Sequence, residues 1–174
     1  TYFSTSFARG GASLVTSAGI ITKVYFPRSV VPIAAALSPL VDFAMAFVIL
    51  LVMMGWYGIS PTWGIVFLPV FMLLAFLTAL SVSLWLSPLD VKYRDVKYII
   101  PFLAQVWMYA SPVIYSVSLV PEKWRLFYGL NPMAGVIEGF RWALLGKGSP
   151  DLAVMAISTG VVILVLLAGL VYFN

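Results

Sequence analysis

The sequence predicts an all-α membrane protein, a polytopic bundle of helices. Of its 174 residues, 63% are hydrophobic and only 9% are charged, whereas soluble domains carry about a quarter charged residues. Long stretches carry no charge, at 43–89, 98–121 and 152–174, and short charged clusters separate them. Because roughly 20 apolar residues in a helix cross the hydrocarbon core, these stretches predict membrane-spanning helices joined by water-facing loops.

The first part of the chain predicts one partial and one complete crossing. Residues 1–14 have the character of the tail of a span, which we expect the glycines of Arg9–Gly11 to loosen. The chain begins without a methionine inside this apolar stretch, so we expect it to be a fragment of a longer protein. Residues 29–56 predict a complete span, which should kink at Pro39 because proline removes a helical hydrogen bond.

Three further crossings are predicted, over 63–86, over 98–120, which contains Pro101 and Pro112, and over 152–173. The turn that precedes the first of these, 57–62, carries no charge and is flanked by tryptophans, which favour the membrane interface. The segment 87–97, in contrast, is the most densely charged part of the chain. We predict no internal repeat and a single membrane domain over 1–174.

The positions of lysine and arginine predict the orientation of these spans. Basic residues occupy the loop around 23–28 and the loop 87–97, which lie at one end of the predicted hairpin. The tip of the hairpin, the 57–62 turn, lies at the other end and has none. Because cytoplasmic loops are enriched in lysine and arginine, we assign both loops to the cytoplasm and the turn to the outside. The segment 121–150, with charges of both signs, is then external.

The external segment contains the signals of a helix with defined ends. Asn131 is a favourable N-cap, Pro132 suits the first helical position, and Gly146 suits the residue after the last turn. Glu138 and Arg141 are three residues apart and can pair on one face. Two arrangements fit: a helix that rests on the outer bilayer surface, or a re-entrant helix that lines an exit.

Two other features also have two interpretations. Residues 20–28 alternate apolar and polar side chains, which suits either a short amphipathic helix that docks a cytoplasmic partner or an interfacial anchor. Asp42 lies near the middle of a predicted span. A carboxylate there marks a polar path or a contact between helices, or it is protonated and bonded to a neighbouring helix.

Aromatic residues make up 16% of the chain. An aromatic face offers apolar area for a sugar ring to stack on, so aromatic residues in the spans are candidates for a transport path. The alternative is that they pack between helices or face lipid. The candidates are Trp85, Phe102, Trp107, Tyr109 and Tyr115.

Composition excludes several classes of function. The chain contains no cysteine and no histidine, so it has no disulfide, no thiolate nucleophile and no typical zinc site. No P-loop, acid pair at glycosidase spacing or nucleophile triad occurs, so we predict no covalent chemistry, metal site or cofactor in this chain. The net charge of +4 comes from residues that flank spans, and we predict no nucleic-acid partner.

Three segments, in order and spacing, carry a resemblance to one family. They are 23–32, with Lys23-Val24-Tyr25-Phe26-Pro27-Arg28 and Val30-Val31-Pro32, then 93–98, and then 131–142. In these segments the chain resembles the permease subunit of type-2 ABC exporters of cell-surface polysaccharides, which move O antigens, teichoic acids and capsules. The resemblance extends over nearly the whole chain.

The resemblance implies an assembly. Such a permease has six spans, an N-terminal amphipathic helix, a second copy in a homodimer, and a separate dimer of ABC ATPase subunits that binds ATP and magnesium. The amphipathic helix, the first span and the start of the second would lie outside this chain. The implied location is the bacterial cytoplasmic membrane, and the implied substrate is a polysaccharide, undecaprenyl-diphosphate-linked.

The resemblance also implies roles for segments and residues. The coupling helix of the family corresponds to 17–28, and its external gating helices correspond to 121–150. The substrate path would include Asp42 and the five aromatic candidates. The residues expected to contact the ATPase are Lys23, Tyr25, Phe26 and Arg28. The residues expected to form the external gate are Asn131, Pro132, Glu138, Phe140, Arg141 and Trp142.

A drug or lipid exporter of the same superfamily is the alternative within transport. A membrane-embedded glycan-processing enzyme and a purely structural membrane scaffold are alternatives from other classes. The enzyme would need clustered acids or a metal site, whereas the sequence offers only the isolated Asp42 and the paired Glu138.

Overall fold

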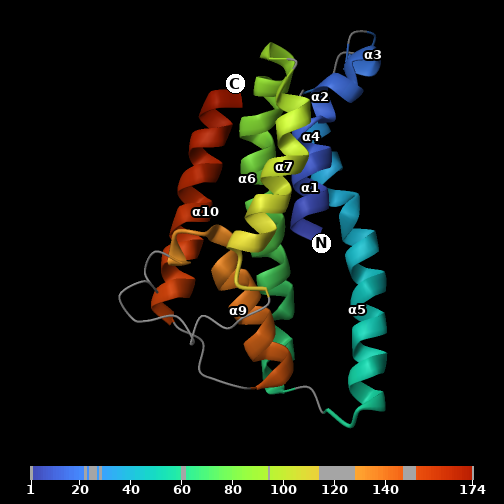
Figure 1. The fold of residues 1–174 in the computed structure, drawn as a ribbon, viewed down its shortest axis with the longest axis vertical. Helices are drawn as coiled ribbons and strands as arrows, with labels where there is room; N and C mark the ends of the chain where they lie inside the picture. The colour runs from blue at the N-terminus through green and yellow to red at the C-terminus, as the bar shows by residue number, and fades with distance from the viewer. Residues whose placement is uncertain are drawn as a thin grey trace.

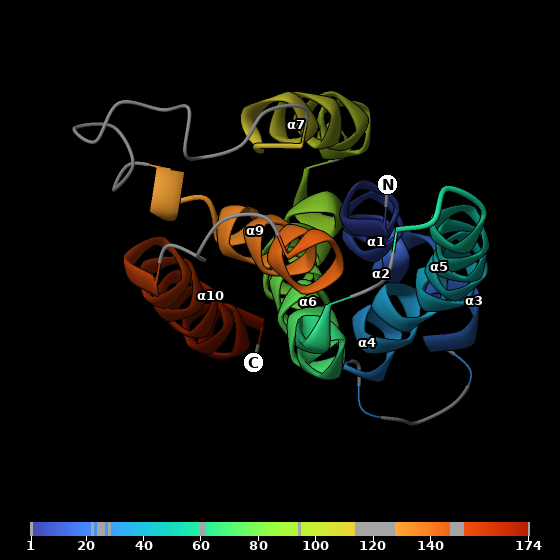
Figure 2. The ribbon, with the colours of Figure 1, turned by 90° about the horizontal axis from the view of Figure 1, so that it is seen from below.

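The described part of the chain is a bundle of α-helices in a computed structural model, shown in two views in Figures 1 and 2. The structure describes residues 2–21, 23, 27, 29–59, 62–93, 95–113, 128–146 and 152–173. Within these ranges the structure contains helices and no strand, which confirms the predicted all-α class. The helices are α1 (Tyr2–Gly11), α2 (Ser13–Thr16), α3 (Ala18–Ile21), α4 (Val30–Leu37), α5 (Pro39–Trp56), the 3-10 helix η1 (Trp63–Phe67), α6 (Leu68–Lys92), α7 (Val96–Ala110), α9 (Pro132–Leu145) and α10 (Leu152–Phe173).

Three segments are long and apolar enough to cross a membrane: Val30–Trp56, Trp63–Lys92 and Leu152–Phe173. They correspond to three of the predicted spans. The second is longer than predicted, because α6 continues beyond 86 through Pro88 to Lys92. Ser87 and Asp90 on its last turns are buried, so packing holds the helix together where the proline weakens it.

The predicted kink at Pro39 is confirmed. The first crossing divides at Ser38 into α4 and α5, and Pro39 takes the first position of α5. In Figure 1, α4 lies beside α1 whereas α5 leans away from the other helices. The apolar side chains of α5 are accordingly exposed, with only Pro39 and Met54 buried.

The predicted span over 98–120 is wrong in its extent. Helix α7 begins earlier, at Val96, and ends at Ala110 after 15 residues. At 1.5 Å per residue this helix reaches only about 22 Å, less than the hydrocarbon thickness of about 30 Å. Ser111 is extended, with ψ 144°, because the residue before a proline avoids the helical conformation. The helix therefore ends just before Pro112, which the predicted span had included.

The helix is interrupted directly after the glycines of α1, close to where the sequence predicted a loosening. Helix α1 ends at Gly11, which is buried together with Gly10, and α2 begins at Ser13 after the single residue Ala12. A Cβ atom on Gly10 would overlap the side chain of Ser83 on α6, and one on Gly11 would overlap Ile100 of α7. Small residues therefore let the backbone of α1 approach its neighbours, the usual means of packing helices in membranes.

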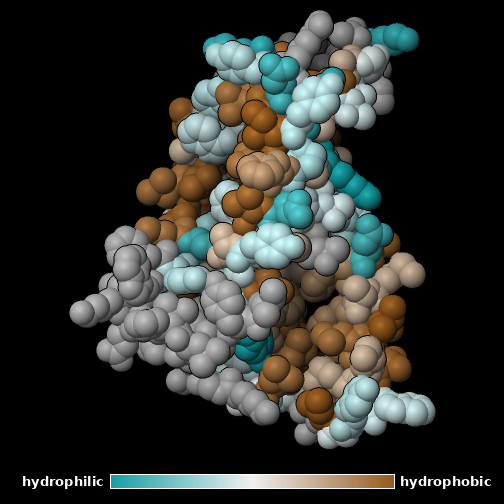
Figure 3. All heavy atoms as spheres, in the orientation of Figure 1, coloured by the Kyte–Doolittle hydropathy of each residue, from teal (hydrophilic) through white to brown (hydrophobic). Residues whose placement is uncertain are grey.

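The two ends of the bundle carry different loops. The end of α3, the start of α4, the junction of α6 and α7, and the end of α10 lie at one end, and the end of α5 and the start of η1 lie at the other (Figure 1). Trp56, Tyr57 and Trp63 at this second end are 88%, 72% and 79% exposed, as expected for an aromatic belt. Figure 3 shows extensive apolar surface between the two ends.

The orientation can be tested by thiol labelling, because the chain contains no cysteine. A cysteine at Ile59, exposed at the uncharged turn, is expected to react with an impermeant thiol reagent in intact cells. A cysteine at Asp95, exposed at the charged junction, is expected to react only after the membrane is opened. The reverse labelling pattern would invert the assignment of the two ends.

Candidate functional site

The helix at the centre of the candidate site, α9, has the ends that the sequence predicts. The side chain of Asn131 accepts a hydrogen bond from the backbone N–H of Met133 at 3.0 Å, and Pro132 occupies the first position. Gly146 ends the helix with φ 61°, a left-handed conformation that glycine adopts without strain.

Helix α9 packs lengthwise inside the bundle, between α6 and α10 (Figure 2). Its glycines make this close packing possible. A Cβ atom on Gly135 would overlap Ser158 of α10, and one on Gly139 would overlap the ring of Phe71 on α6. The other end of α9 lies beside η1, where Ala143 contacts Gly64. Helix α9 is therefore packed along its length against other helices of the bundle.

Glu138 and Arg141 form the predicted pair. Arg141 Nη1 lies 3.6 Å from Glu138 Oε1, and the two side chains are only 22% and 14% exposed, respectively. Arg141 also donates from Nη2 to the carbonyl oxygens of Pro112 and Val113, each at 3.3 Å. The arginine therefore holds the chain that follows α7, which the sequence did not indicate.

Asn131 connects the end of α7 to the start of α9. Its Nδ2 donates to the carbonyl oxygen of Ala110 at 3.3 Å and to Ser111 Oγ at 3.1 Å. Its Oδ1 accepts from Trp107 Nε1 at 3.1 Å, in addition to the capping hydrogen bond. The side chain of Asn131 thus forms hydrogen bonds with groups of both α7 and α9 where these helices meet.

The five aromatic candidates do not gather at one place. Trp107 packs against Phe3 and Phe7 of α1, with ring centroids 5.6 and 6.2 Å apart. Trp85 stacks on Tyr172 and donates to the carbonyl oxygen of Val165, at the contact of α6 with α10. The two others in described segments, Phe102 and Tyr109, are 64% and 62% exposed on α7, and Tyr115 lies outside the described residues.

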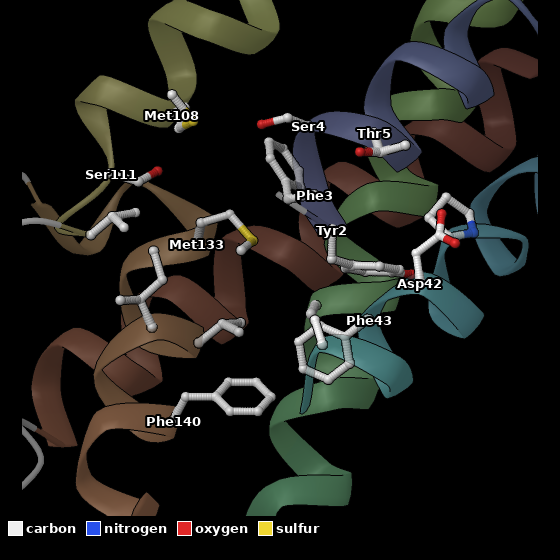
Figure 4. Close-up of a pocket in the computed structure, with 16 residues that line it drawn as sticks. Tyr2, Phe3, Ser4, Thr5, Asp42, Phe43, Met108, Ser111, Met133 and Phe140 are labelled. Atoms are coloured by element: carbon white, nitrogen blue, oxygen red, sulfur yellow. The ribbon is translucent and has the colours of Figure 1, made fainter. Parts of the chain in front are cut away.

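A cavity of about 470 Å³ opens between α1, α5, α7 and α9 (Figure 4). Its wall is mainly apolar. Phe43 of α5 bridges the neighbouring helices, because its ring lies 5.9 Å from that of Tyr2 and 5.8 Å from that of Phe140. Phe140 also contacts Phe71 of α6, so a row of four aromatic rings joins α1, α5, α9 and α6. Of these four, the sequence analysis had selected only Phe140.

Asp42 lies on the wall of this cavity and forms a contact between helices, one of its predicted roles. Its Oδ2 is 4.0 Å from Arg9 Nη2, and Arg9 Nη1 donates to Ser38 Oγ at 3.2 Å. The side chains of Arg9 and Asp42 are 51% and 69% exposed. The sequence analysis missed Arg9 as a partner, although an opposite charge within another apolar stretch was the available signal.

The residues expected to contact an ATPase are described only in part. Lys23 is exposed near α3, at the end of the bundle that also carries the junction of α6 and α7. Tyr25, Phe26 and Arg28 lie outside the described residues. The other expected gate residue, Trp142, packs against Phe67 with ring centroids 5.9 Å apart.

Three segments long and apolar enough to cross a membrane, a helix of only 15 residues and a helix packed beside a cavity define a polytopic membrane protein. In a membrane, an interrupted backbone is tolerated only where protein or a cavity surrounds it. The sequence matches the ABC-2 type transporter family over residues 12–145, and the chain belongs to this family.

Three curated relatives are each named as the O-antigen export system permease protein RfbA. The protein from Myxococcus xanthus is 30% identical over 152 residues, which are 86% of this chain and 58% of the relative. Two proteins from Klebsiella pneumoniae are 27% and 26% identical, over 99% and 80% of this chain. The chain spans 67% and 54% of their lengths.

The close packing of α9 on α6 predicts that Gly139→Ala destabilises the protein. The new methyl group would overlap the ring of Phe71, and overpacking of this kind costs about 1 to 3 kcal/mol. Gly160→Ala on α10 is the matched control, because a Cβ atom there meets nothing within 4 Å. Thermal unfolding in detergent should show a lower midpoint for Gly139→Ala alone. Equal midpoints would contradict the described packing of α9.

Proposed function

We propose that this chain is the membrane-spanning part of an ATP-driven exporter of a cell-surface polysaccharide. Its membership of the ABC-2 type transporter family and the printed names of three relatives support this function. The observation that carries the proposal in the structure is helix α9, which lies beside a cavity at the end of a half-length helix. A polysaccharide is transported without any covalent step in this chain.

The proposed assembly contains two copies of the permease and two ATPase subunits, in the bacterial cytoplasmic membrane. The ATPase binds ATP and magnesium, and the segment 17–28 docks it through Lys23, Tyr25, Phe26 and Arg28. The substrate is a polysaccharide such as an O antigen, a teichoic acid or a capsule, linked to undecaprenyl diphosphate. Asp42 and the aromatic residues of α6 and α7 stay candidates for the path.

In the proposed mechanism, movement of the ATPase is transmitted through segment 17–28 to the spans. The gate is formed by α9 on the external side, where Phe140 contacts Phe43 across the cavity and Trp142 packs on η1. Displacement of α9 would open the exit. The Glu138 and Arg141 pair holds the closed position because it ties α9 to the chain after α7.

A lipid exporter is the second candidate, because the cavity between α1, α5 and α9 is mainly apolar. Both candidates can be tested with the full-length protein and its own ATPase in a strain that lacks its permease. Restored polysaccharide at the cell surface, detected by staining of extracted glycans, supports the proposed function. If polysaccharide is not restored at the cell surface and the lipid composition of the outer leaflet changes, the lipid exporter is favoured.

Charge reversal tests the docking segment. The double variant Lys23→Glu and Arg28→Glu is expected to abolish export while the protein still inserts, because interface charges left unpaired cost about 2 to 5 kcal/mol. Co-purification of the ATPase should be lost as well. Lys97→Glu, at the other charged loop, is the control and should keep the ATPase bound. Normal export by the double variant would reduce the segment to a membrane anchor.

Neutralising either member of the Glu138 and Arg141 pair tests the gate. Because both side chains are mostly covered, losing their ion pair costs more than the 1 kcal/mol or less of an exposed pair and up to about 5 kcal/mol. Glu138→Gln and Arg141→Gln are each expected to impair export or to make cells leak ions. Asp95→Asn, exposed at the opposite end, is the control. Wild-type export and a tight membrane in both variants would exclude a gate.

A further inference from the structure

The chain that leaves α7 is bound at two separate points of α9. We call residues 110–113, from Ala110 to Val113, the strap. Asn131 donates to Ala110 and Ser111 at one end of the strap, and Arg141 donates to the carbonyl oxygens of Pro112 and Val113 at the other. The two side chains are ten positions apart on α9 and reach neighbouring residues of the strap. Contacts at both ends of the strap fix its position and its direction along α9.

Two neighbouring residues reinforce these attachments. Trp107, one turn before the end of α7, donates its indole N–H to the same Asn131 Oδ1 that caps α9. Glu138 pairs with Arg141 and covers part of its charge. The attachments therefore begin in α7 itself, continue along the strap and end on α9.

The contacts of α9 with its other neighbours are of a different kind. At Gly135 and Gly139 it meets α10 and α6 through close van der Waals packing. Such packing can slide without leaving a polar group unpaired. Separating α9 from the strap would strand carbonyl groups and a guanidinium at membrane depth, where an unpaired polar group is costly.

We propose that the strap makes α7 and α9 move as one body, so that the cytoplasmic end of α7 sets the position of α9. Asn131 and Arg141 are positioning residues in this arrangement. A push on the junction between α6 and α7 then reaches the opposite side of the membrane through the strap. The role of this motion in export rests on the proposed function. The connection between α7 and α9 is independent of that function.

The connection can be measured as a distance between spin labels in the full-length permease bound to its ATPase, in a version without other cysteines. Labels at Val106→Cys on α7 and Leu145→Cys on α9 suit this purpose, because these side chains are 47% and 45% exposed and carry little packing. One narrow distance is expected, and it should be unchanged between the nucleotide-free and ATP-bound states.

Three variants weaken the strap while keeping other roles of the same residues. Trp107→Phe keeps the ring but loses the indole donor. Asn131→Ser keeps an N-cap but is too short to reach Ala110. Arg141→Lys keeps the charge beside Glu138 but loses the planar fork, whose Nη1 faces Glu138 while Nη2 serves the two carbonyl groups. The matched control is Trp85→Phe, which loses an indole hydrogen bond to Val165 at the contact of α6 with α10.

Each strap variant is expected to show a second, longer distance whose population rises about five- to tenfold, the shift that losing one hydrogen bond of typical strength produces. The control should keep the single distance. Unchanged distances in Trp107→Phe and Arg141→Lys, or a distance between the labels that changes with ATP in the parent protein, would overturn the proposal. If a strap variant loses export while the distance between its labels stays unchanged, the proposed function still holds but the strap does not explain the loss. Altered distances with normal export would keep the connection between α7 and α9 and show that export does not depend on it.

Discussion

A helix that stops inside a bundle must find partners for its last carbonyl groups, and this requirement organises the site around α9. Helix α7 ends at Ala110, and the groups that follow need hydrogen-bond partners from the protein wherever water does not reach them. Asn131 binds Ala110, and Arg141 binds Pro112 and Val113. The position of α9 is therefore fixed by the polar groups that it satisfies, while its glycines allow it to fit between α6 and α10.

Glycine has the same structural role at two close helix contacts on α6. Gly10 lets α1 approach Ser83 on α6, and Gly139 lets α9 approach Phe71 on the same helix. Because lipid is as apolar as the side chains, helices in a membrane gain little from hydrophobic burial and depend on close packing. Helices α1 and α9 thus pack closely on α6 because glycines, which have no side chain, stand at the points of contact.

The sequence predicted those features that depend on local chemistry. Uncharged stretches located three crossings, Pro39 marked a break, and the residues from Asn131 to Gly146 defined both ends of α9. The pair of Glu138 and Arg141 followed from their spacing within one helix. In each case the signal and the structure lie within a few residues of each other, so no knowledge of the tertiary arrangement was needed.

The features that the sequence did not predict depend on which helices become neighbours. Pro112 was visible, but whether a proline kinks or ends a helix depends on the partners available to the freed carbonyl groups. Arg9 and Asp42 are far apart in the chain, and only the packing of α1 beside α5 joins them. Trp85 looked equivalent to Trp107, yet one packs on α10 and the other on α1 and Asn131.

The break at Ser38 gives the two halves of one crossing different mechanical properties. One half, α4, is packed on α1 and α6, whereas the other half, α5, contacts α1, reaches Phe140 through the ring of Phe43, and buries Met54 against α6 and α9. A tilt of α5 about Ser38 would leave α4 in place but would pull Met54 away from Leu68 and Phe71. The space beside Phe140 can therefore widen towards α5 only when the cluster around Met54 opens as well.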